Sequence, residues 1–311
     1  MINELSILLP SYNNCCAELV AALQRQAEAA ARKTGLDYEI IVGDDGSTDT
    51  SAVERNKAID SLPRCRYIIR KKNTGRAAIR NFLAREARCE WLLFIDSDMT
   101  LHNGKLIDNY INTETEGAIY GGYEIRGDET LLRGNLRYKY EKSASRNNSA
   151  TERRRSQYDK FHISNFAVRR AVMLAHPLDE RITRYGHEDL LFGKTLELSG
   201  IRITHIDNPV TFEDFETNAD FMAKTEESVA MLCELENELR DFSNIIKLTE
   251  RLERLRLTPA VRLFYKIFSN RLKSNLTGNK PSVLLFNIYK LGMFCTIKYR
   301  KTRPKTSHPD A

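Results

Sequence analysis

Short runs of apolar and β-branched residues alternate with longer helix-favouring runs along residues 1–125. The short runs predict strands at residues 5–9, 38–42, 66–69, 91–95 and 118–123. Runs rich in Ala, Leu, Arg and Glu lie between them and predict helices at residues 16–33, 51–60 and 76–88. Apolar strands that alternate with helices indicate a largely parallel sheet covered on both faces. We therefore expect an α/β fold.

Beyond residue 126 the pattern is less regular. Residues 127–159 are charged and weakly periodic, and we expect a mobile loop or a long crossing segment there. Residues 190–198 predict a helix, and residues 220–257 predict a longer one with an apolar face. Pro259 is expected to mark the end of the longer helix, because proline disrupts a helix interior.

Polar residues follow three of the predicted strands directly. The sequence PSYNN occupies residues 10–14, GDDGSTD occupies residues 43–49, and DSD occupies residues 96–98. In parallel sheets, ligands bind outside the carboxyl ends of the strands. We therefore expect the three polar segments to form one site.

Charge separates the end of the chain from the rest. Residues 261–311 hold eleven Lys or Arg and one acid, a formal charge of +10. Since the whole chain carries +6, residues 1–260 carry −4. A mildly acidic body argues against a nucleic-acid-binding core, so we expect no nucleic acid partner. The basic end, taken alone, could meet anionic lipid or nucleic acid.

Cysteine usage and the start of the chain bear on the compartment. The six cysteines form no CxxC motif and no spaced Cys/His set, so we expect free thiols in a reducing compartment. The first residues show no basic segment and no long apolar run. No stretch reaches about twenty uninterrupted apolar residues, the length of a membrane span. We expect a cytoplasmic protein.

Asp96 and Asp98 are the sharpest chemical feature of the sequence. Carboxylates two positions apart after a buried strand can bind one hard cation. Such a cation could bridge a diphosphate and neutralise the charge of a leaving group. Taken alone, a turn in which the Asp side chains accept hydrogen bonds from nearby amides is the commoner explanation.

Other segments also have two interpretations each. Residues 43–49 form a turn and a helix cap, or they place carboxylates on a nucleobase or ribose. Residues 73–81 form a solvated cationic turn, or they bind an anion at a helix start. Glu188 and Asp189 cap a helix, or they supply a general base for an acceptor hydroxyl. The histidines show no metal-binding spacing, and His205 is the weak candidate among them.

The order of these segments is more specific than any one of them. LSILLPSYN, EIIVGDDGSTD, NTG with Arg80 and Asn81, FIDSD, Asn165 and GHED follow one another along the chain. In this order residues 4–215 closely resemble family 2 glycosyltransferases. The resemblance implies a GT-A fold, a nucleoside-diphosphate-sugar donor with UDP as the expected nucleotide, and inversion at the anomeric carbon.

The resemblance also implies a role for single residues. The positions that would contact the nucleotide are Pro10, Tyr12, Asp44, Asp45, Arg76, Arg80 and Asp96. Asp98, together with Asp96, would bind Mn²⁺ or Mg²⁺ across the diphosphate. Asp189 would be the catalytic base, and Glu188 would contact the acceptor or the donor sugar.

One position departs from the family pattern. Many relatives have a metal-binding histidine about twenty residues after the Glu-Asp motif, and here the aligned residue is Phe212. A phenyl ring cannot coordinate a metal. His205, Glu213 or Asp214 could substitute, water could fill the place, or metal binding could be weaker.

The resemblance and the charge pattern together predict the organisation of the chain. Residues 1–215 form the catalytic domain, with a nucleotide-binding half at 1–125 and an acceptor half at 126–215. Residues 216–260 form a helical extension, and residues 261–311 form a basic amphipathic tail. Within that tail, the apolar run at 282–299 could lie in a membrane headgroup region, or it could cap the catalytic domain.

The leading hypothesis is a hexosyl- or N-acetylhexosaminyltransferase of polysaccharide biosynthesis that acts on a saccharide or lipid-linked saccharide at the inner membrane face. The alternative is a non-catalytic nucleotide- or saccharide-binding subunit of a glycan assembly complex. A nucleotidyltransferase would show a Gly-rich loop after the first strand, and a dehydrogenase would show GxGxxG there. Residues 10–14 contain neither motif.

Overall fold

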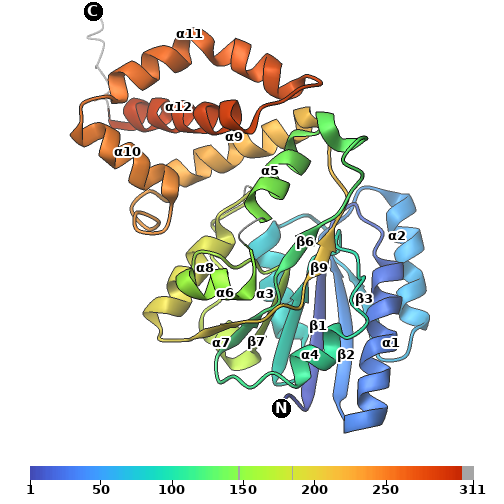
Figure 1. Cartoon of the computed structure of the whole chain (residues 1–311). Helices are drawn as coiled ribbons and strands as arrows, with labels where there is room; N and C mark the ends of the chain where they lie inside the picture. Colours follow the sequence, from blue (N-terminus) through green and yellow to red (C-terminus); the bar gives the residue numbers. More distant parts are fainter. Residues whose placement is uncertain (146–147, 184, 303–311) are drawn as a thin grey trace, which may run out of the picture. The chain divides into compact units, whose positions relative to one another are not determined.

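The computed structural model describes residues 1–145, 148–183 and 185–302. These residues divide into two compact units, which Figure 1 shows coloured along the sequence. The sheet unit comprises residues 1–127, 141–145, 148–183 and 188–214. The helical unit comprises residues 128–140, 185–187 and 215–302.

A seven-stranded sheet forms the centre of the sheet unit, in the order β3-β2-β1-β4-β7-β5-β8. Its strands are β1 (Glu4–Ser11), β2 (Asp37–Asp44), β3 (Cys65–Ile69), β4 (Trp91–Ile95), β5 (Ala118–Tyr120), β7 (Asn165–Arg169) and β8 (Ile203–His205). β7 runs antiparallel to both of its neighbours, and the other pairs are parallel. The expected α/β architecture with a mostly parallel sheet is confirmed.

The strand order reverses at β1. The chain passes from β1 outward to β2 and β3, then returns to place β4 on the other side of β1. Ser11 at the end of β1 pairs in register with Asp44 at the end of β2. The polar segments after β1, β2 and β4 therefore leave the sheet at the switch point, where α/β sheets bind ligands.

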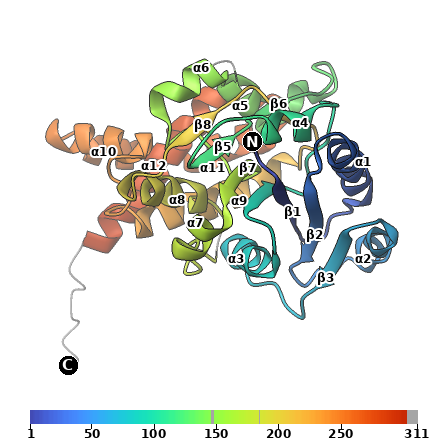
Figure 2. The ribbon, with the colours of Figure 1, turned by 90° about the horizontal axis from the view of Figure 1, so that it is seen from below.

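Helices cover both faces of this sheet. α3 (Arg76–Glu86), α7 (Arg170–Ala175) and α8 (Glu188–Leu198) bury apolar side chains in one core cluster with Leu8, Phe94 and Phe166 of the sheet. α1 (Ala17–Thr34) packs with α4 (Leu106–Ile111). Figure 2 shows α1 and α2 (Thr50–Asn56) on one side of β1–β3 and α3 on the other.

The predicted strands and helices of residues 1–95 are confirmed to within a few residues, with η1 (Lys57–Ser61) extending α2. The expected strand at 118–123 is instead two strands, β5 and β6 (Tyr123–Ile125), because the chain bends at Gly121 and Gly122. A Cβ at Gly121 would lie 2.4 Å from Asn165 Nδ2, and Gly122 has a φ of +84°. β6 pairs with β9 (Val210–Phe212) in a separate two-stranded sheet.

Residues 127–159, expected to be a mobile loop or a long crossing segment, are largely helical where the structure describes them. They contain η2 (Leu132–Gly134), α5 (Leu136–Ser145), α6 (Ala150–Arg153) and η3 (Arg154–Ser156), while residues 146 and 147 lie outside the described chain. Two of the arginines that make the apolar pattern of this segment irregular are accommodated inside the fold. Arg137 forms an ion pair with Glu216, and Arg153 is buried.

The helical unit is built on four long helices. They are α9 (Asn218–Glu234), α10 (Asn244–Arg254), α11 (Thr258–Thr277) and α12 (Val283–Thr302). The single helix expected over 220–257 is therefore two helices, α9 and α10. Pro259 lies in the first turn of α11, where a backbone N–H would have no partner within the helix, so its absence costs nothing. Figure 1 shows α12 between α11 and α9.

α12 is the core of this unit, since Phe286, Tyr289 and Phe294 are all buried. The core also takes Phe221 and Met222 from α9 and Leu272 and Leu276 from α11. Burial of these side chains explains why the apolar run at 282–299 carries so many large residues. In the part of the chain that the structure describes, no helix is both long and apolar enough to span a membrane.

Candidate active site

The loop after β1 joins the other two polar loops. Asn13 adopts a φ of +50°, and its Oδ1 accepts hydrogen bonds from the backbone N–H groups of Thr48 (2.7 Å) and Asp49 (2.9 Å). Asn14 Nδ2 donates to the carbonyl oxygen of Ser97 at 2.6 Å. The three polar segments therefore lie together in the structure, and two asparagine side chains connect them.

Asp44 and Asp45 are buried and hold the backbone of this site. Asp44 Oδ1 accepts the Ser47 N–H at 2.7 Å, and its Oδ2 accepts the Tyr67 hydroxyl at 2.6 Å. Asp45 accepts the N–H groups of Thr74 and Gly75, both at 2.9 Å, and the Arg70 guanidinium at 2.9 Å. The carboxylate oxygens of Asp44 and Asp45 thus already accept hydrogen bonds within the protein. The predicted contacts of these two residues with a nucleotide remain predictions.

Tyr12 differs from these aspartates. Its side chain is 46% exposed at the carboxyl end of β1, and Pro10 just before it is half-buried. An exposed aromatic ring beside the switch point can stack on a planar base. The structure thus leaves Tyr12 accessible for its predicted role.

Arg80 connects the loop after β4 with the start of α8. It is buried on α3, and its guanidinium lies 2.6 Å from Asp96 Oδ1 and 3.5 Å from Glu188 Oε1. Arg76, one turn earlier and exposed, lies 3.8 Å from the same Glu188 oxygen. The two arginines predicted to contact phosphates therefore face the carboxylates of two separate motifs.

Glu188 and Asp189 lie in the first turn of α8 but differ in accessibility. The Glu188 side chain is 4% exposed, whereas that of Asp189 is 24% exposed. Asp189 Oδ2 lies 3.3 Å from His162 Nδ1, and its Oδ1 is buried and accepts no hydrogen bond from the described residues. Asp189 is therefore the better placed of the two to accept a proton from a bound hydroxyl.

The surroundings shift the pKa values of these groups in opposite directions. Burial and the charge of Asp189 raise the pKa of Glu188, and Arg76 and Arg80 compensate only in part. Burial also acts to raise the pKa of Asp189, but the hydrogen bond from His162 and the charge of Arg80 outweigh it and lower that pKa. Partial desolvation opposes protonation of His162, whose side chain is 51% exposed, but the hydrogen bond to Asp189 and the charge of Asp189 raise the His162 pKa.

Asp96 and Asp98 offer the carboxylate oxygens that Mn²⁺ and Mg²⁺ prefer. Asp96 Oδ1 already faces Arg80, and the described residues contain no group of three Asp, Glu, His or Cys side chains that could enclose an ion. Mg²⁺ sites commonly use one or two carboxylates plus substrate phosphates. The donor set therefore fits a cation held mainly by Asp98 and a bound diphosphate.

The geometry counts against His205 as a metal ligand. β7 and β5 separate its strand, β8, from β4. Arg153 Nε donates to His205 Nδ1 at 3.3 Å, and His205 Nε2 lies 3.0 Å from the Gln157 carbonyl oxygen. Burial, with help from the charge of Arg153, lowers the pKa of His205 to about 4. Both ring nitrogens are thus committed to structural bonds.

The segment around Phe212 lies beside the Asp98 loop. Thr211 forms a two-hydrogen-bond bridge with Thr100, two residues after Asp98. Phe212 itself is buried, while Glu213 is accessible and lies 3.3 Å from His102. Of the substitutes considered for the missing histidine, Glu213 and Asp214 are exposed and come shortly after the bridged Thr211, whereas His205 precedes it on β8.

The family model for glycosyl transferase family 2 matches residues 6–180, which is more than half of the chain. The chain belongs to this family. Its curated relatives include the poly(ribitol-phosphate) beta-N-acetylglucosaminyltransferase TarP of Staphylococcus aureus (strain N315), which is 30% identical over 132 residues. That match covers 40% of this chain and 38% of TarP, so the chain spans less than half the length of this relative.

Solved structures show the same fold. The mannosyltransferase PcManGT from Pyrobaculum calidifontis, in complex with GDP-Man and Mn²⁺, has a TM-score of 0.54 at 15% identity, covering 96% of this chain and 86% of that one. S. aureus TarS 1–349, in complex with UDP-GlcNAc, has a TM-score of 0.51 at 18% identity, covering 97% and 93%. The likeness establishes the GT-A fold of this family 2 chain.

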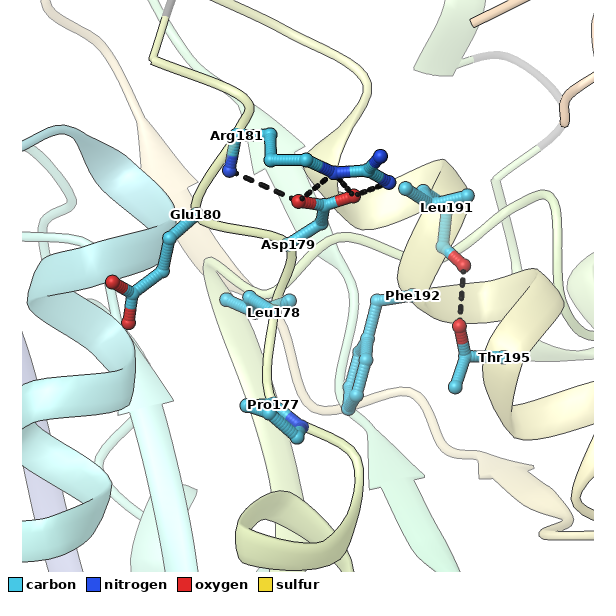
Figure 3. A pocket seen from close by; sticks show the side chains of 8 residues that line it. All are labelled: Pro177, Leu178, Asp179, Glu180, Arg181, Leu191, Phe192 and Thr195. Atoms are coloured by element: carbon cyan, nitrogen blue, oxygen red, sulfur yellow. Dashed lines mark hydrogen bonds and ion pairs between the residues drawn. The ribbon is translucent and has the colours of Figure 1, made fainter.

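A cavity of about 500 Å³ lies next to α8 and is a different feature from the site above. Its lining residues are Pro177, Leu178, Asp179, Glu180, Arg181, Leu191, Phe192 and Thr195 (Figure 3). Figure 3 shows Arg181 turned back onto Asp179, and the two form an ion pair across the rim. None of the residues predicted for the transferase site lines this cavity.

Sequence reasoning missed His162 and the bridging role of Arg80. His162 lies 27 positions before Asp189, and an isolated histidine carries no signal without knowledge of its neighbour. Arg80 was predicted to meet phosphate, and its carboxylate partners come from positions 96 and 188. Asn165, quoted only as part of the family pattern, is buried and bonds to the Gly122 and Asn208 carbonyl oxygens.

Proposed function

We propose that this family 2 chain is an inverting glycosyltransferase of polysaccharide biosynthesis. It would move a sugar from a nucleoside-diphosphate donor, with UDP as the nucleotide, to a saccharide or lipid-linked saccharide. The observation that carries the proposal is the Arg80 bridge, which joins Asp96 of the DSD segment to Glu188, the neighbour of Asp189. The donor-side and acceptor-side carboxylates therefore belong to one connected cluster.

In the proposed reaction, Asp189 accepts the proton of the acceptor hydroxyl. The acceptor oxygen forms a bond to the anomeric carbon while the bond from that carbon to the diphosphate oxygen breaks, and the nucleoside diphosphate leaves with the electron pair. Displacement from the opposite face inverts the configuration. His162, bonded to Asp189 Oδ2, would hold the carboxylate in one orientation at the start of α8.

Asp98 is the proposed ligand of Mn²⁺ or Mg²⁺, with Asp96 in a secondary role. The cation supplies Lewis-acid stabilisation of the departing diphosphate. Glu213 is the proposed substitute for the histidine that Phe212 replaces, because it follows Thr211 in the segment bridged to Thr100. The nucleotide would stack on Tyr12 and rest against Pro10, while Asp44 and Asp45 hold the loops around it.

We also propose an N-acetylhexosaminyl or hexosyl group as the transferred sugar, since TarP is named as an N-acetylglucosaminyltransferase. The division into a catalytic domain at 1–215, a helical extension at 216–260 and a basic tail at 261–311 stays a proposal. Action in the cytoplasm, on the inner membrane face, is likewise a proposal.

The test is a panel of nucleotide sugars with Mn²⁺, assayed for release of the nucleoside diphosphate with and without saccharide acceptors. The proposal expects one UDP-sugar to be turned over. Phe212 favours a second candidate, a non-catalytic binding subunit, because it removes a metal ligand found in many relatives. Calorimetry separates the two: binding of UDP without turnover of any donor would support the subunit, and absence of UDP binding would contradict both.

A further inference from the structure

α11 presents an apolar stripe to solvent. Leu263, Phe264 and Ile267 are 58%, 42% and 61% exposed, and their spacing places them on one face of the helix. The Phe264 ring lies 4.8 Å from the ring of Phe268, which is partly buried against the core of the helical unit. The opposite face of α11 buries Leu272 and Leu276 in the core of the helical unit. The exposed stripe is therefore not needed to hold α11 in place.

The turn before α11 extends this surface. Leu255 and Leu257, between α10 and α11, are also exposed. We call these five side chains the α11 surface: Leu255, Leu257, Leu263, Phe264 and Ile267. α12, by contrast, contains the apolar run that the sequence offered for membrane contact, and it buries Phe286, Tyr289 and Phe294 in the helical unit while Leu284 is exposed.

Cations flank the α11 surface. Arg254, Arg256, Lys266 and Arg271 are exposed on α10, the turn and α11. The sequence holds no Asp or Glu between Arg254 and Pro309. The nearest acids of α10 and α9 are already paired, Glu253 with Lys298 and Glu226 with Lys273, both at 2.7 Å. The surface thus combines apolar side chains with uncompensated positive charge.

We propose that the α11 surface docks the chain on an anionic lipid bilayer. Its apolar side chains insert among the acyl chains near the headgroups, and the flanking cations face lipid phosphates. A second copy of the chain is a poorer occupant, because two such surfaces would bring cations together with no acid to pair them. This proposal concerns only the helical unit and does not depend on the transferase activity of the sheet unit.

The test is co-sedimentation of the full chain with two kinds of vesicle, phosphatidylcholine alone and an equal mixture with phosphatidylglycerol. We expect binding to the anionic vesicles, little binding to the neutral ones, and release at high salt. The variant Leu263→Ser/Phe264→Ser/Ile267→Ser should bind at least about tenfold more weakly. Lys266→Glu/Arg271→Glu should also lose binding, and both should keep the thermal unfolding profile.

The matched control is Leu131→Ser/Leu198→Ser, which removes two exposed leucines outside the α11 surface and should bind like the unmodified chain. Equal binding to neutral vesicles, or wild-type affinity in the triple variant, would overturn the proposal. Sedimentation equilibrium tests whether a second copy of the chain occupies the α11 surface instead. Self-association that disappears in the triple variant, without any vesicle binding, would assign the surface to a second copy instead.

Discussion

Arg80 is the residue on which the candidate site depends most. Its buried guanidinium balances Asp96 and Glu188, which come from different parts of the chain. We expect Arg80→Met to lower the free energy of unfolding by about 3–5 kcal/mol, because it leaves carboxylates buried without their partner. Arg85→Met, on the same helix but exposed and 4.0 Å from Glu180, should change it by less than about 0.5 kcal/mol. Equal stability of the two variants in urea titrations would remove Arg80 from this role.

His162 makes a second residue-scale prediction through Asp189. Since the hydrogen bond from His162 helps to lower the pKa of Asp189, His162→Gln should raise that pKa. The acidic limb of the kcat/KM profile should therefore move to higher pH, while the nucleotide Kd stays constant. His176→Gln, in the turn after α7, is the control. An unchanged acidic limb would show that His162 does not act on Asp189.

The pairing of His162 with Asp189 also makes the stability of the fold depend on pH. The pKa of His162 is raised in the folded chain, so protonated His162 stabilises the fold below its ordinary pKa of about 6.5. This stabilisation is lost as the pH rises through the folded-state pKa. Comparing unfolding free energies of the unmodified chain and His162→Gln from pH 5 to 9 should show their difference shrinking toward alkaline pH.

Which site residues the sequence could predict follows from their partners. Asp96, Asp98, Glu188 and Asp189 stand at strand ends or a helix start, positions where polar residues have a recognisable meaning. Asp45 was assigned to a nucleotide, but its bonds to Thr74 and Gly75 depend on how two loops meet. Such long-range pairing leaves no periodic trace in one sequence.

At the scale of elements, the position of α8 depends on Gly193. A Cβ there would lie 2.1 Å from the Tyr158 carbonyl oxygen and 2.7 Å from the Phe161 ring. Gly193→Ala should displace α8, lower the unfolding free energy by about 1–3 kcal/mol and reduce kcat, because α8 carries Asp189. Gly104→Ala, where a Cβ meets nothing within 4 Å, is the control. An unchanged kcat in Gly193→Ala would show that catalysis does not depend on the position of α8.

The hydrophobic pattern predicted the buried strands well, since β1, β2 and β4 each contain an uninterrupted apolar run, at residues 7–9, 40–42 and 91–95. It failed where charged residues pair inside the fold. The sequence does not predict α5 and α6, because residues 127–159 are charged and weakly periodic, yet Arg137 pairs with Glu216 and Arg153 donates to the Ile206 carbonyl oxygen. The sequence does not predict the break between α9 and α10, because residues 235–243 contain neither Gly nor Pro.

At the scale of the whole molecule, the proposed mechanism requires a bound metal ion as well as the base Asp189. Chelation by EDTA should abolish transfer, and Mn²⁺ or Mg²⁺ should restore it. Asp98→Asn should require a higher Mn²⁺ concentration for half-maximal activity, and calorimetry of UDP with Mn²⁺ should show weaker ternary binding. Full activity after chelation would contradict a metal-dependent reaction.

The order of motifs along the chain predicted the GT-A fold and the family, because each motif marks the end of a strand or the start of a helix. The helical unit was less predictable. The apolar run at 282–299 predicted either a helix in a membrane headgroup region or a helix that caps the catalytic domain, whereas in the structure α12 buries Phe286, Tyr289 and Phe294 in the core of the helical unit and α11 exposes an apolar stripe. Which amphipathic helix faces solvent depends on packing among α9, α11 and α12, which hydropathy alone does not encode.

The most direct test of the account compares the unmodified chain with Asp189→Asn on the donor and acceptor found in the panel. General base catalysis typically contributes about 10²–10⁴-fold. We predict a fall in kcat of about that size, with the Kd for UDP in the presence of Mn²⁺ unchanged. Full turnover by Asp189→Asn would contradict the assignment of Asp189 as the base and the mechanism built on it.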